Sequence, residues 1–172
     1  MLVIVRARGC QELLLYLYLV DGWRPSWWDR AMDTVQNKAV VEEFDRLGMR
    51  GGDLARLDAL CTPDMVNHAL APGRPAGLEG TREFLRSAQR DVHGVRWVEY
   101  FTVAEDDMVV QFGSREHHWP GGRFRGFDAP AGTYVRGTAF AYRLAAGRIA
   151  ERWAIRDDLA MLLQLGAIHP PG

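Results

Sequence analysis

The chain has 172 residues, of which 48% are hydrophobic and 25% charged, and its formal net charge is −1 at pH 7. These values are typical of one globular domain with a sizeable core. The near-zero charge argues against electrostatic binding to nucleic acid or to an anionic membrane. The two cysteines, Cys10 and Cys61, show no metal-binding spacing and indicate no disulfide framework, which favours a reduced, cytoplasmic setting.

The N-terminal segment contains an apolar run, Leu13 to Val20, that follows two arginines and resembles a signal sequence. The run is too short to span a bilayer, and no small-residue cleavage site follows it. We therefore interpret residues 1–31 as an extension outside the domain, which then covers residues 32–168. Two explanations stay open: a start codon upstream of the true first residue, Met32, or a helix that packs on the domain or its partner.

Hydrophobic spacing predicts three helices in the first half of the domain, at residues 33–48, 53–62 and 80–92. A short extended segment at 64–69 and a loop rich in proline and glycine separate the last two. The second half is strand-like at residues 95–104, 108–119, 133–144 and 148–156. A loop covers residues 120–132, and a final apolar helix starts near Leu159.

This order of elements predicts an α+β fold, because helices come first and an antiparallel meander follows. We expect a curved antiparallel sheet with helices on its concave side, and a pocket enclosed between them. The sequence has no internal repeat, phosphate-binding loop or dinucleotide fingerprint. No nucleotide cofactor is therefore predicted.

The last strand ends at a pair of aspartates. Alternation places Glu151, Trp153, Ile155 and Asp157 on one face. A carboxylate in line with Trp and Ile on the buried face is costly unless it is paired or used. This makes Asp157 a candidate acid or base in an apolar pocket, with a pKa raised by desolvation. The alternative is that one of the two aspartates caps the following helix.

Three strings of this sequence resemble the SnoaL-like polyketide cyclases, within the nuclear-transport-factor-2-like superfamily. They are NKAVVEEF at 37–44, GGDLARLDALCTPDMVNHALAPG at 51–73 and RIAERWAIRDDLAMLLQLG at 148–166, and RFRGFDAPAGTYVRG at 123–137 is a weaker match. The resemblance covers residues 32–168. It implies a cone-shaped α+β barrel, often dimeric or tetrameric, in a family that includes ring-closing cyclases, hydroxylases and binding proteins.

The resemblance also implies roles for particular residues. Asp157 matches the family's acid/base aspartate, which takes a proton from a carbon between carbonyls and starts an intramolecular aldol reaction without metal or cofactor; Asp158 would then cap the helix. His68, after Asn67, matches a pocket-facing histidine that could donate a hydrogen bond to the enolate oxygen. The alternative is a histidine whose hydrogen bonds are satisfied near the pocket rim.

Two adjacent histidines, His117 and His118, lie where family members often carry one. Only one of them can face inward, and His118 shares its parity with Val110 and Phe112, which favours His118 as the catalytic one. The pair has no third ligand at a fixed spacing, so no metal site is predicted. Arg115 resembles the first member of the Arg-x-Asp arrangement of epoxide hydrolases on the same fold, but here His117 stands at the position of the Asp.

We therefore predict a cofactor-independent polyketide or ester cyclase that acts on a small hydrophobic, polycyclic aromatic substrate as a homodimer or homotetramer. The predicted catalytic residues are Asp157, His68 and His118. The predicted substrate-binding residues are Asn67, His117, Trp153, Phe112, Arg115 and Trp97. The alternatives are a hydroxylase or epoxide hydrolase on the same fold and a small-molecule-binding protein without chemistry.

Overall fold

The computed structural model describes residues 28–71, 73–91 and 93–169. Met1–Met32 and Asp33–Gly172 are separate units, and the elements below belong to the second, apart from the first residues of α2. The proposed extension at residues 1–31 lies almost entirely outside the described residues and stays a prediction. No helix among the described residues is long and apolar enough to cross a membrane.

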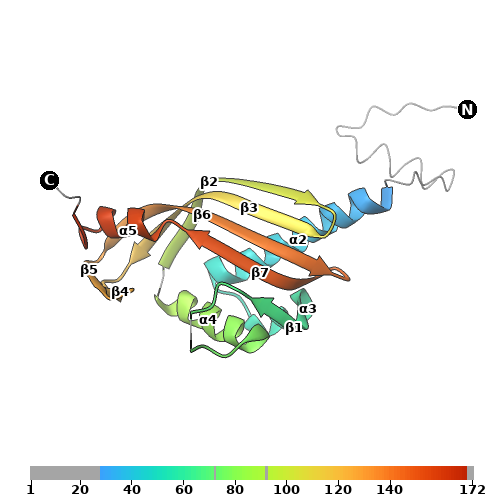
Figure 1. Cartoon of the computed structure of the whole chain (residues 1–172), viewed down its shortest axis with the longest axis horizontal. Coiled ribbons are helices and arrows are strands. Elements are labelled where there is room, and N and C mark those ends of the chain that lie inside the picture. The colour runs from blue at the N-terminus through green and yellow to red at the C-terminus, as the bar shows by residue number, and fades with distance from the viewer. Residues whose placement is uncertain (1–27, 72, 92, 170–172) are drawn as a thin grey trace, which may run out of the picture. The chain divides into compact units, whose positions relative to one another are not determined.

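The fold is built on a five-stranded sheet with the order β1-β7-β6-β3-β2 (Figure 1). Strand β1 pairs in parallel with β7, and the other three pairs are antiparallel, so the predicted sheet is correct except at this edge. The strands are β1 (Cys61–Asn67), β2 (His93–Glu105), β3 (Met108–Trp119), β6 (Gly132–Ala145) and β7 (Arg148–Arg156).

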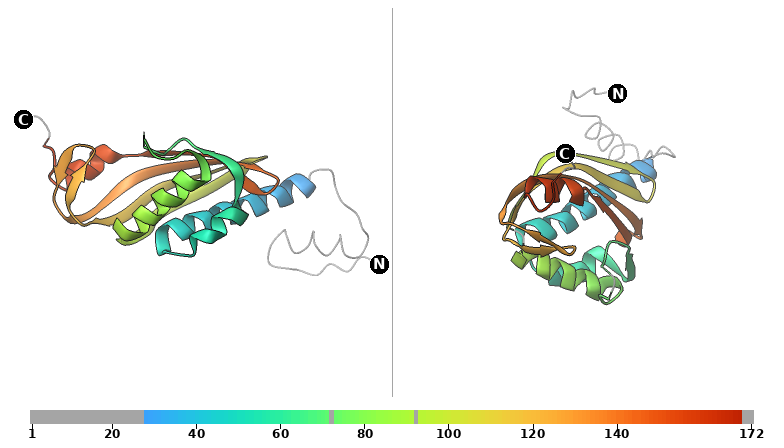
Figure 2. Two further views of the ribbon diagram at one scale, coloured as in Figure 1. Left: turned by 90° about the horizontal axis from the view of Figure 1, so that it is seen from below. Right: turned by 60° about the vertical axis from the view of Figure 1, so that its left-hand side comes forward.

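The helices that precede the meander lie on one side of this sheet, and the sheet curves around α2 (Figure 2). This arrangement confirms the predicted α+β class. The helical elements are α2 (Trp28–Arg50), η1 (Leu54–Arg56), α3 (Leu57–Leu60), α4 (Gly77–Asp91) and, after the last strand, α5 (Asp158–Gln164). Helix α2 extends further in both directions than the predicted 33–48.

The segment predicted as a loop, 120–132, contains a hairpin of two short strands, β4 (Gly122–Phe124) and β5 (Phe127–Ala129). Its three-residue strands are too short to show an alternating pattern, which is why the sequence did not reveal them. Ala129 belongs to a small apolar cluster with Tyr134 of β6 and Met161 of α5. The hairpin and α5 therefore close one end of the sheet.

The main core lies between α2 and the concave face of the sheet. It includes residues of α2, α3, α4 and five strands, among them Val41, Phe44, Leu47, Leu57, Cys61, Val109, Tyr142 and Ile149. Six of these eight are fully buried at 0%, and Tyr142 and Phe44 expose 1% and 2%. This packing anchors the long helix on the sheet and fixes the position of the side chains beyond the core.

A β-bulge in β7 decides which side chains of that strand face the helices. Arg143 of β6 lies opposite Glu151, and Leu144 lies opposite Ile149, so Ala150 is the extra residue. The alternation therefore changes phase: Ile149 and Arg152 are both buried on the concave side although three positions separate them. From this point Arg152, Ala154 and Arg156 face inward, because the last two line the same cavity as Arg152.

Candidate functional site

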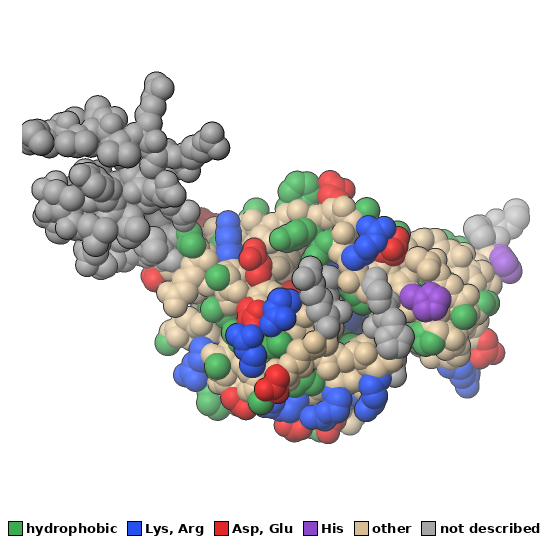
Figure 3. All heavy atoms as spheres, turned by 180° about the vertical axis from the view of Figure 1, so that it is seen from behind, with side chains coloured by type: hydrophobic (Ala, Val, Ile, Leu, Met, Phe, Trp, Pro, Cys, Tyr) green, Lys and Arg blue, Asp and Glu red, His purple; other side chains and the backbone are tan. Residues whose placement is uncertain are grey.

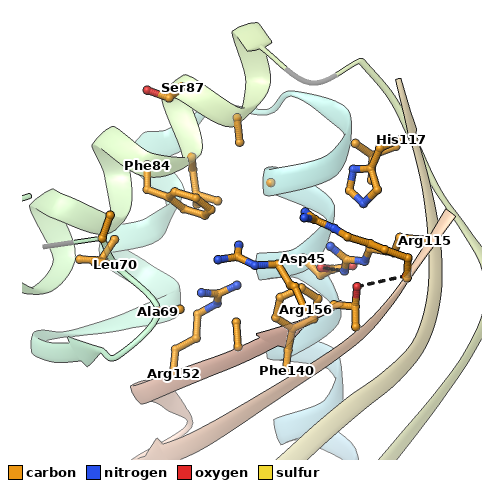
Figure 4. Close-up of a pocket in the computed structure, with 18 of the residues that line it drawn as sticks. Asp45, Ala69, Leu70, Phe84, Ser87, Arg115, His117, Phe140, Arg152 and Arg156 are labelled. Carbon is orange, nitrogen blue, oxygen red and sulfur yellow. Dashed lines mark hydrogen bonds and ion pairs between the residues drawn. The ribbon is translucent and has the colours of Figure 1, made fainter. Parts of the chain in front are cut away.

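A cavity of about 670 Å³ lies between the concave face of the sheet and helices α2 and α4, beyond the apolar core. Its walls combine aromatic rings with guanidinium groups, as Figure 4 shows for part of the lining. Pockets of about 300–1,000 Å³ hold drug-sized molecules. The lining residues used in the argument are Asp45, Phe84, Arg115, His117, Arg136, Phe140, Arg152 and Arg156.

Asp45 of α2 and Arg115 of β3 form an ion pair across the cavity wall. Both side chains are nearly buried, with 12% and 9% of their surface exposed. The indole Nε1 of Trp97 donates to the second oxygen of Asp45 at 3.1 Å, and the Arg115 guanidinium stacks over the Trp97 ring at 4.1 Å. Each oxygen of the Asp45 carboxylate therefore has a partner, and these three side chains connect α2 to β2 and β3.

Arg136 of β6 is the second paired arginine of the cavity. Its Nη1 lies 2.8 Å from Oδ1 of Asp158, whose other oxygen lies 2.5 Å from Nε of Arg125. One carboxylate therefore serves two arginines. Because Asp158 is the first residue of α5, this contact also fixes the start of that helix against the sheet.

Arg152 and Arg156 of β7 have no such partner. Arg152 is 5% exposed, and its Nη1 lies 3.3 Å from the amide Oδ1 of Asn67; among the described residues it meets no carboxylate. Its guanidinium lies 5.0 Å from the centre of the Phe140 ring. The Arg156 side chain forms neither a hydrogen bond nor an ion pair with any described residue, and burial together with the charges of Arg136 and Arg152 lowers its pKa to about 10. It remains charged at neutral pH.

His117 of β3 is a second titratable group of the cavity whose side chain has no hydrogen-bond partner among the described residues. The residue is 7% exposed, its ring stacks on Tyr134 at 5.2 Å, and both ring nitrogens are buried without a hydrogen-bond partner among the described residues. Burial, together with the positive charges of Arg136, Arg115 and Arg156, lowers the pKa of His117 to about 3. The imidazole is therefore neutral at pH 7, and its ring nitrogens are available for a hydrogen bond.

The predicted position of Asp157 is wrong. Its side chain is exposed and accepts a hydrogen bond from the Ala160 amide at 2.9 Å, so Asp157 is the N-cap of α5 and Asp158 is not. The bulge at Ala150 is the reason, since it sends 151, 153, 155 and 157 to the outer face; Ile155 is 75% exposed. Trp153 shares that face and does not line the cavity.

The choice between the two adjacent histidines was also wrong, because Phe112, whose parity His118 shares, lies on the outer face of β3. His118 is exposed and lies 3.5 Å from the hydroxyl of Thr133, whereas His117 faces the cavity, so the preference for His118 is wrong. His68 borders the cavity, but its ring stacks on Trp153 at 4.8 Å and its Nε2 lies 3.0 Å from Glu151. His68, Trp153 and Glu151 therefore form a partly exposed cluster at the β1–β7 edge of the sheet.

The remaining predicted residues divide into three groups. Arg115 lines the cavity, as predicted for a binding residue. Asn67 and Trp97 stand behind the lining, where they contact Arg152 and Arg115. Phe112 is 44% exposed on the outer face, stacked on Phe101, so its predicted place in the pocket is wrong.

Sequence reasoning missed Asp45, Arg136, Arg152 and Arg156. For Arg152 and Arg156, the signal in the sequence was their even spacing along the last strand, which places both on one face. Only the bulge shows that this face is the one toward the cavity. Among the described residues, no three His, Cys, Asp or Glu side chains come close enough together to hold a metal ion.

Comparisons with solved structures find the same fold in bacterial proteins. TsrD of Streptomyces laurentii is 23% identical, with 78% of this chain and 97% of that chain covered and a TM-score of 0.65. IdmH of Streptomyces antibioticus, described as a candidate polyketide cyclase, is 24% identical over 76% and 99% with a TM-score of 0.61. AclR of Streptomyces galilaeus, described as a candidate hydroxylase, is 17% identical over 81% and 86% with a TM-score of 0.60.

A search of curated proteins found no match. The family described as SnoaL-like polyketide cyclase matches residues 38–165, which include all the helices and strands around the cavity except the first residues of α2. This chain therefore belongs to the SnoaL-like polyketide cyclase family.

Proposed function

We propose that the chain closes a ring in a polyketide-like substrate by a cofactor-independent aldol reaction, with His117 rather than Asp157 as the acid/base. The observation that carries the proposal is the position of this histidine. It is a neutral imidazole with two unpartnered nitrogens in the wall of a ligand-sized cavity. Three arginines surround it closely enough to lower its pKa.

The proposed reaction needs only groups that line the cavity. A ring nitrogen of His117 takes the proton from a carbon between two carbonyls, and the electron pair of the broken C–H bond forms an enolate. The enolate carbon attacks a second carbonyl of the same molecule, which forms the C–C bond. The resulting alkoxide then takes the proton back from the imidazolium, so that all atoms are retained and no co-reactant is required.

The arginines would hold the negative oxygen atoms of the enolate and the alkoxide. Guanidinium groups stabilise developing charge strongly once a bound substrate displaces the water that would otherwise screen them. The oxyanion would also offset the positive charge that lowers the pKa of His117. A weak base in the empty cavity thereby becomes a stronger one when the enolate forms beside it.

The test is ring closure of an aromatic β-keto ester that carries a second carbonyl, followed by absorbance and chromatography. We expect His117→Gln to slow the protein-catalysed rate about 10²–10⁴-fold, the usual contribution of a general acid/base. His118→Gln is the matched control, since His118 is the adjacent, exposed histidine. Equal rates for His117→Gln and the wild type would refute the assignment.

A binding protein without chemistry is the second candidate. The low pKa of His117 favours it, because an imidazole with a pKa of about 3 is a poor base for most carbon acids. Tight binding of the β-keto ester without ring closure by the wild-type protein would support this reading.

We also propose that the chain forms a homodimer through the outer face of the sheet. Phe101, Phe112, Ala139 and Ile155 are successive cross-strand neighbours on β2, β3, β6 and β7, and we call them the outer apolar row. The three large side chains of this row are 51%, 44% and 75% exposed. Contiguous exposed apolar surface marks interfaces, and a two-fold axis across the row would pair it with itself.

A further inference from the structure

The cavity holds more positive than negative charge. Arg115, Arg136, Arg152 and Arg156 line it from three adjacent strands, and Asp45 and Asp158 are the carboxylates that pair with the first two. The surface is different: on the face drawn in Figure 3, basic and acidic side chains lie close to one another. Arg74 and Arg125 also line the cavity; Arg74 is exposed, and Arg125 shares Asp158 with Arg136. Of the lining arginines that are not exposed, Arg152 and Arg156 are the two that pair with no carboxylate among the described residues.

The two unpaired guanidinium groups point into the same space. Figure 4 shows both side chains reaching from β7 into the region between that strand and α4. Arg152 and Arg156 are four positions apart on one strand, so their Cα atoms are separated by about 13 Å, and two long side chains can approach a common ligand. Their proximity is also felt electrostatically, because Arg152 lowers the pKa of Arg156.

Several arginines of the cavity have N–H donors that no described residue accepts. The Nε atoms of Arg115, Arg136 and Arg152 are buried without a partner among the described residues. A buried charge without a counter-charge is costly, so a cavity lined by Arg152 and Arg156, which pair with no carboxylate among the described residues, favours a ligand that supplies a negative charge. The group that completes guanidinium N–H donors best is a planar oxyanion, held by two parallel hydrogen bonds.

We propose that the natural ligand of the cavity is an aromatic carboxylic acid whose carboxylate lies between Arg152 and Arg156. The aromatic part of the ligand would pack on Phe84 and Phe140, which line the same cavity. This inference names the substrate class of the proposed cyclase, and it rests on that proposal only in taking the cavity as the substrate site. It adds a carboxylate to the small hydrophobic, polycyclic aromatic substrate expected from the sequence.

The experiment compares two probes, anthraquinone-2-carboxylate and its methyl ester, by fluorescence or calorimetric titration at constant ionic strength. They share the flat ring system and differ in charge. We expect the acid to bind at least about ten-fold more tightly than the ester, because hydrogen bonds between charged groups contribute more than neutral ones. Equal affinities, or no binding of the acid at millimolar concentration, would overturn the proposal.

Three variants locate the carboxylate. Arg152→Gln and Arg156→Gln should each weaken binding of the acid at least about ten-fold while changing binding of the ester less than about two-fold. Arg148→Gln is the matched control, because Arg148 lies on the same strand but does not line the cavity. Unchanged binding of the acid by both cavity variants would place the ligand elsewhere and overturn the assignment.

Two further measurements keep the outcomes distinct. Arg156→Gln should melt no lower than the wild type, since the charge that it removes has no partner among the described residues; a clear loss of stability would show that Arg156 has a structural role instead. Inorganic phosphate should compete only weakly with the acid, and stronger binding of phosphate would replace the carboxylate assignment. If the acid binds but no ring closure is observed, the proposed reaction is refuted and the carboxylate site stands. If ring closure is observed but acid and ester bind equally, the carboxylate site is refuted and the proposed reaction stands.

Discussion

The two faces of the main sheet differ in what they bury and what they expose. Beyond the apolar core, the concave face carries Arg115, Arg136, Arg152 and Arg156 into the cavity. The outer face of the same strands presents the outer apolar row, whose Ile155 is 75% exposed. Soluble proteins usually place charge outside and large apolar groups inside.

This inversion indicates that both faces meet something besides water. Burying a charge without a counter-charge costs free energy. Exposing a row of large apolar side chains to water also costs free energy, and a partner that covers the row removes that cost. On the concave side the protein itself supplies part of the counter-charge, through Asp45 and Asp158. A ligand would supply the rest on that side, and a second copy of the chain would cover the other.

The largest effect should follow from breaking the Asp45–Arg115 pair on the concave face. Asp45→Asn leaves the nearly buried guanidinium without its charge partner, and removal of one member of a buried pair costs about 3–5 kcal/mol. Urea denaturation should therefore show a large loss of unfolding free energy. Glu43→Gln on the same helix, whose glutamate pairs with the exposed Arg46 and Arg56, is the control and should cost less than about 1 kcal/mol. Similar losses of unfolding free energy for the two variants would show that the Asp45–Arg115 pair contributes no more to stability than an exposed ion pair.

The pH dependence of stability should report the neutral His117. Its pKa is about 3 in the folded protein and near 6.5 in the unfolded chain, so the unfolded chain binds the proton first. The contribution of His117 is therefore complete above about pH 6.5 and is lost as the pH falls toward 3, with a slope of at most about 1.4 kcal/mol per pH unit. Three arginines and no carboxylate cause the shift besides burial, so low pH does not relieve it.

Denaturation at pH 7.5, 5.5 and 4.5 tests this for the wild type and His117→Gln. The variant should lose less stability between the first and the last pH, by about 2–3 kcal/mol. Parallel curves for the two proteins would show that His117 is not held neutral in the folded state.

A smaller effect is expected at the end of β7, where the sequence analysis placed Asp157 on the wrong face of the sheet. Asp157→Ala removes the N-cap of α5 and should lower stability by about 1 kcal/mol. Asp157→Asn should keep most of that stability, since Asn also caps helices, and both variants should retain ring-closing activity. Loss of activity in Asp157→Asn with an intact fold would restore the acid/base role that the sequence suggested.

The smallest effect on the folded monomer should come from the outer face. Ile155→Asp changes an exposed side chain, so it should alter monomer stability by no more than about 0.5 kcal/mol. In contrast, it should weaken dimerisation at least ten-fold in analytical ultracentrifugation, because it places a charge in the interface. Leu159→Asp, at a 60% exposed position on α5 outside the row, is the control. A wild-type protein that is monomeric at high micromolar concentration would refute the proposed dimer.

The fold was largely predictable because its signals are local. Helical spacing before residue 92 and alternation after it were enough to predict three helices, four strands and a final helix. The β4–β5 hairpin was missed because its strands have three residues each. The parallel pairing of β1 was missed because pairing partners are distant in sequence.

The site was less predictable because it depends on the phase of alternation. One extra residue at Ala150 exchanges the faces of the rest of β7, and the pairing of Asp45 with Arg115 joins positions 70 residues apart. Arg115 was predicted from the sequence as a binding residue, whereas Arg152 and Arg156 lie on the face opposite to the one on which the sequence analysis placed the site. The sequence analysis stated that only one of His117 and His118 faces inward. It chose His118 because that residue shares the parity of Phe112, but Phe112 lies on the outer face.

The sequence by itself determined the class of fold and the family, since hydrophobic period and local strings survive without knowledge of contacts. It also determined which residue types are available for chemistry at the end of the last strand. Only the tertiary structure decided which of them face the cavity. The physical reason is that a strand presents its side chains with a period of two, so a single bulge reverses every assignment that follows it.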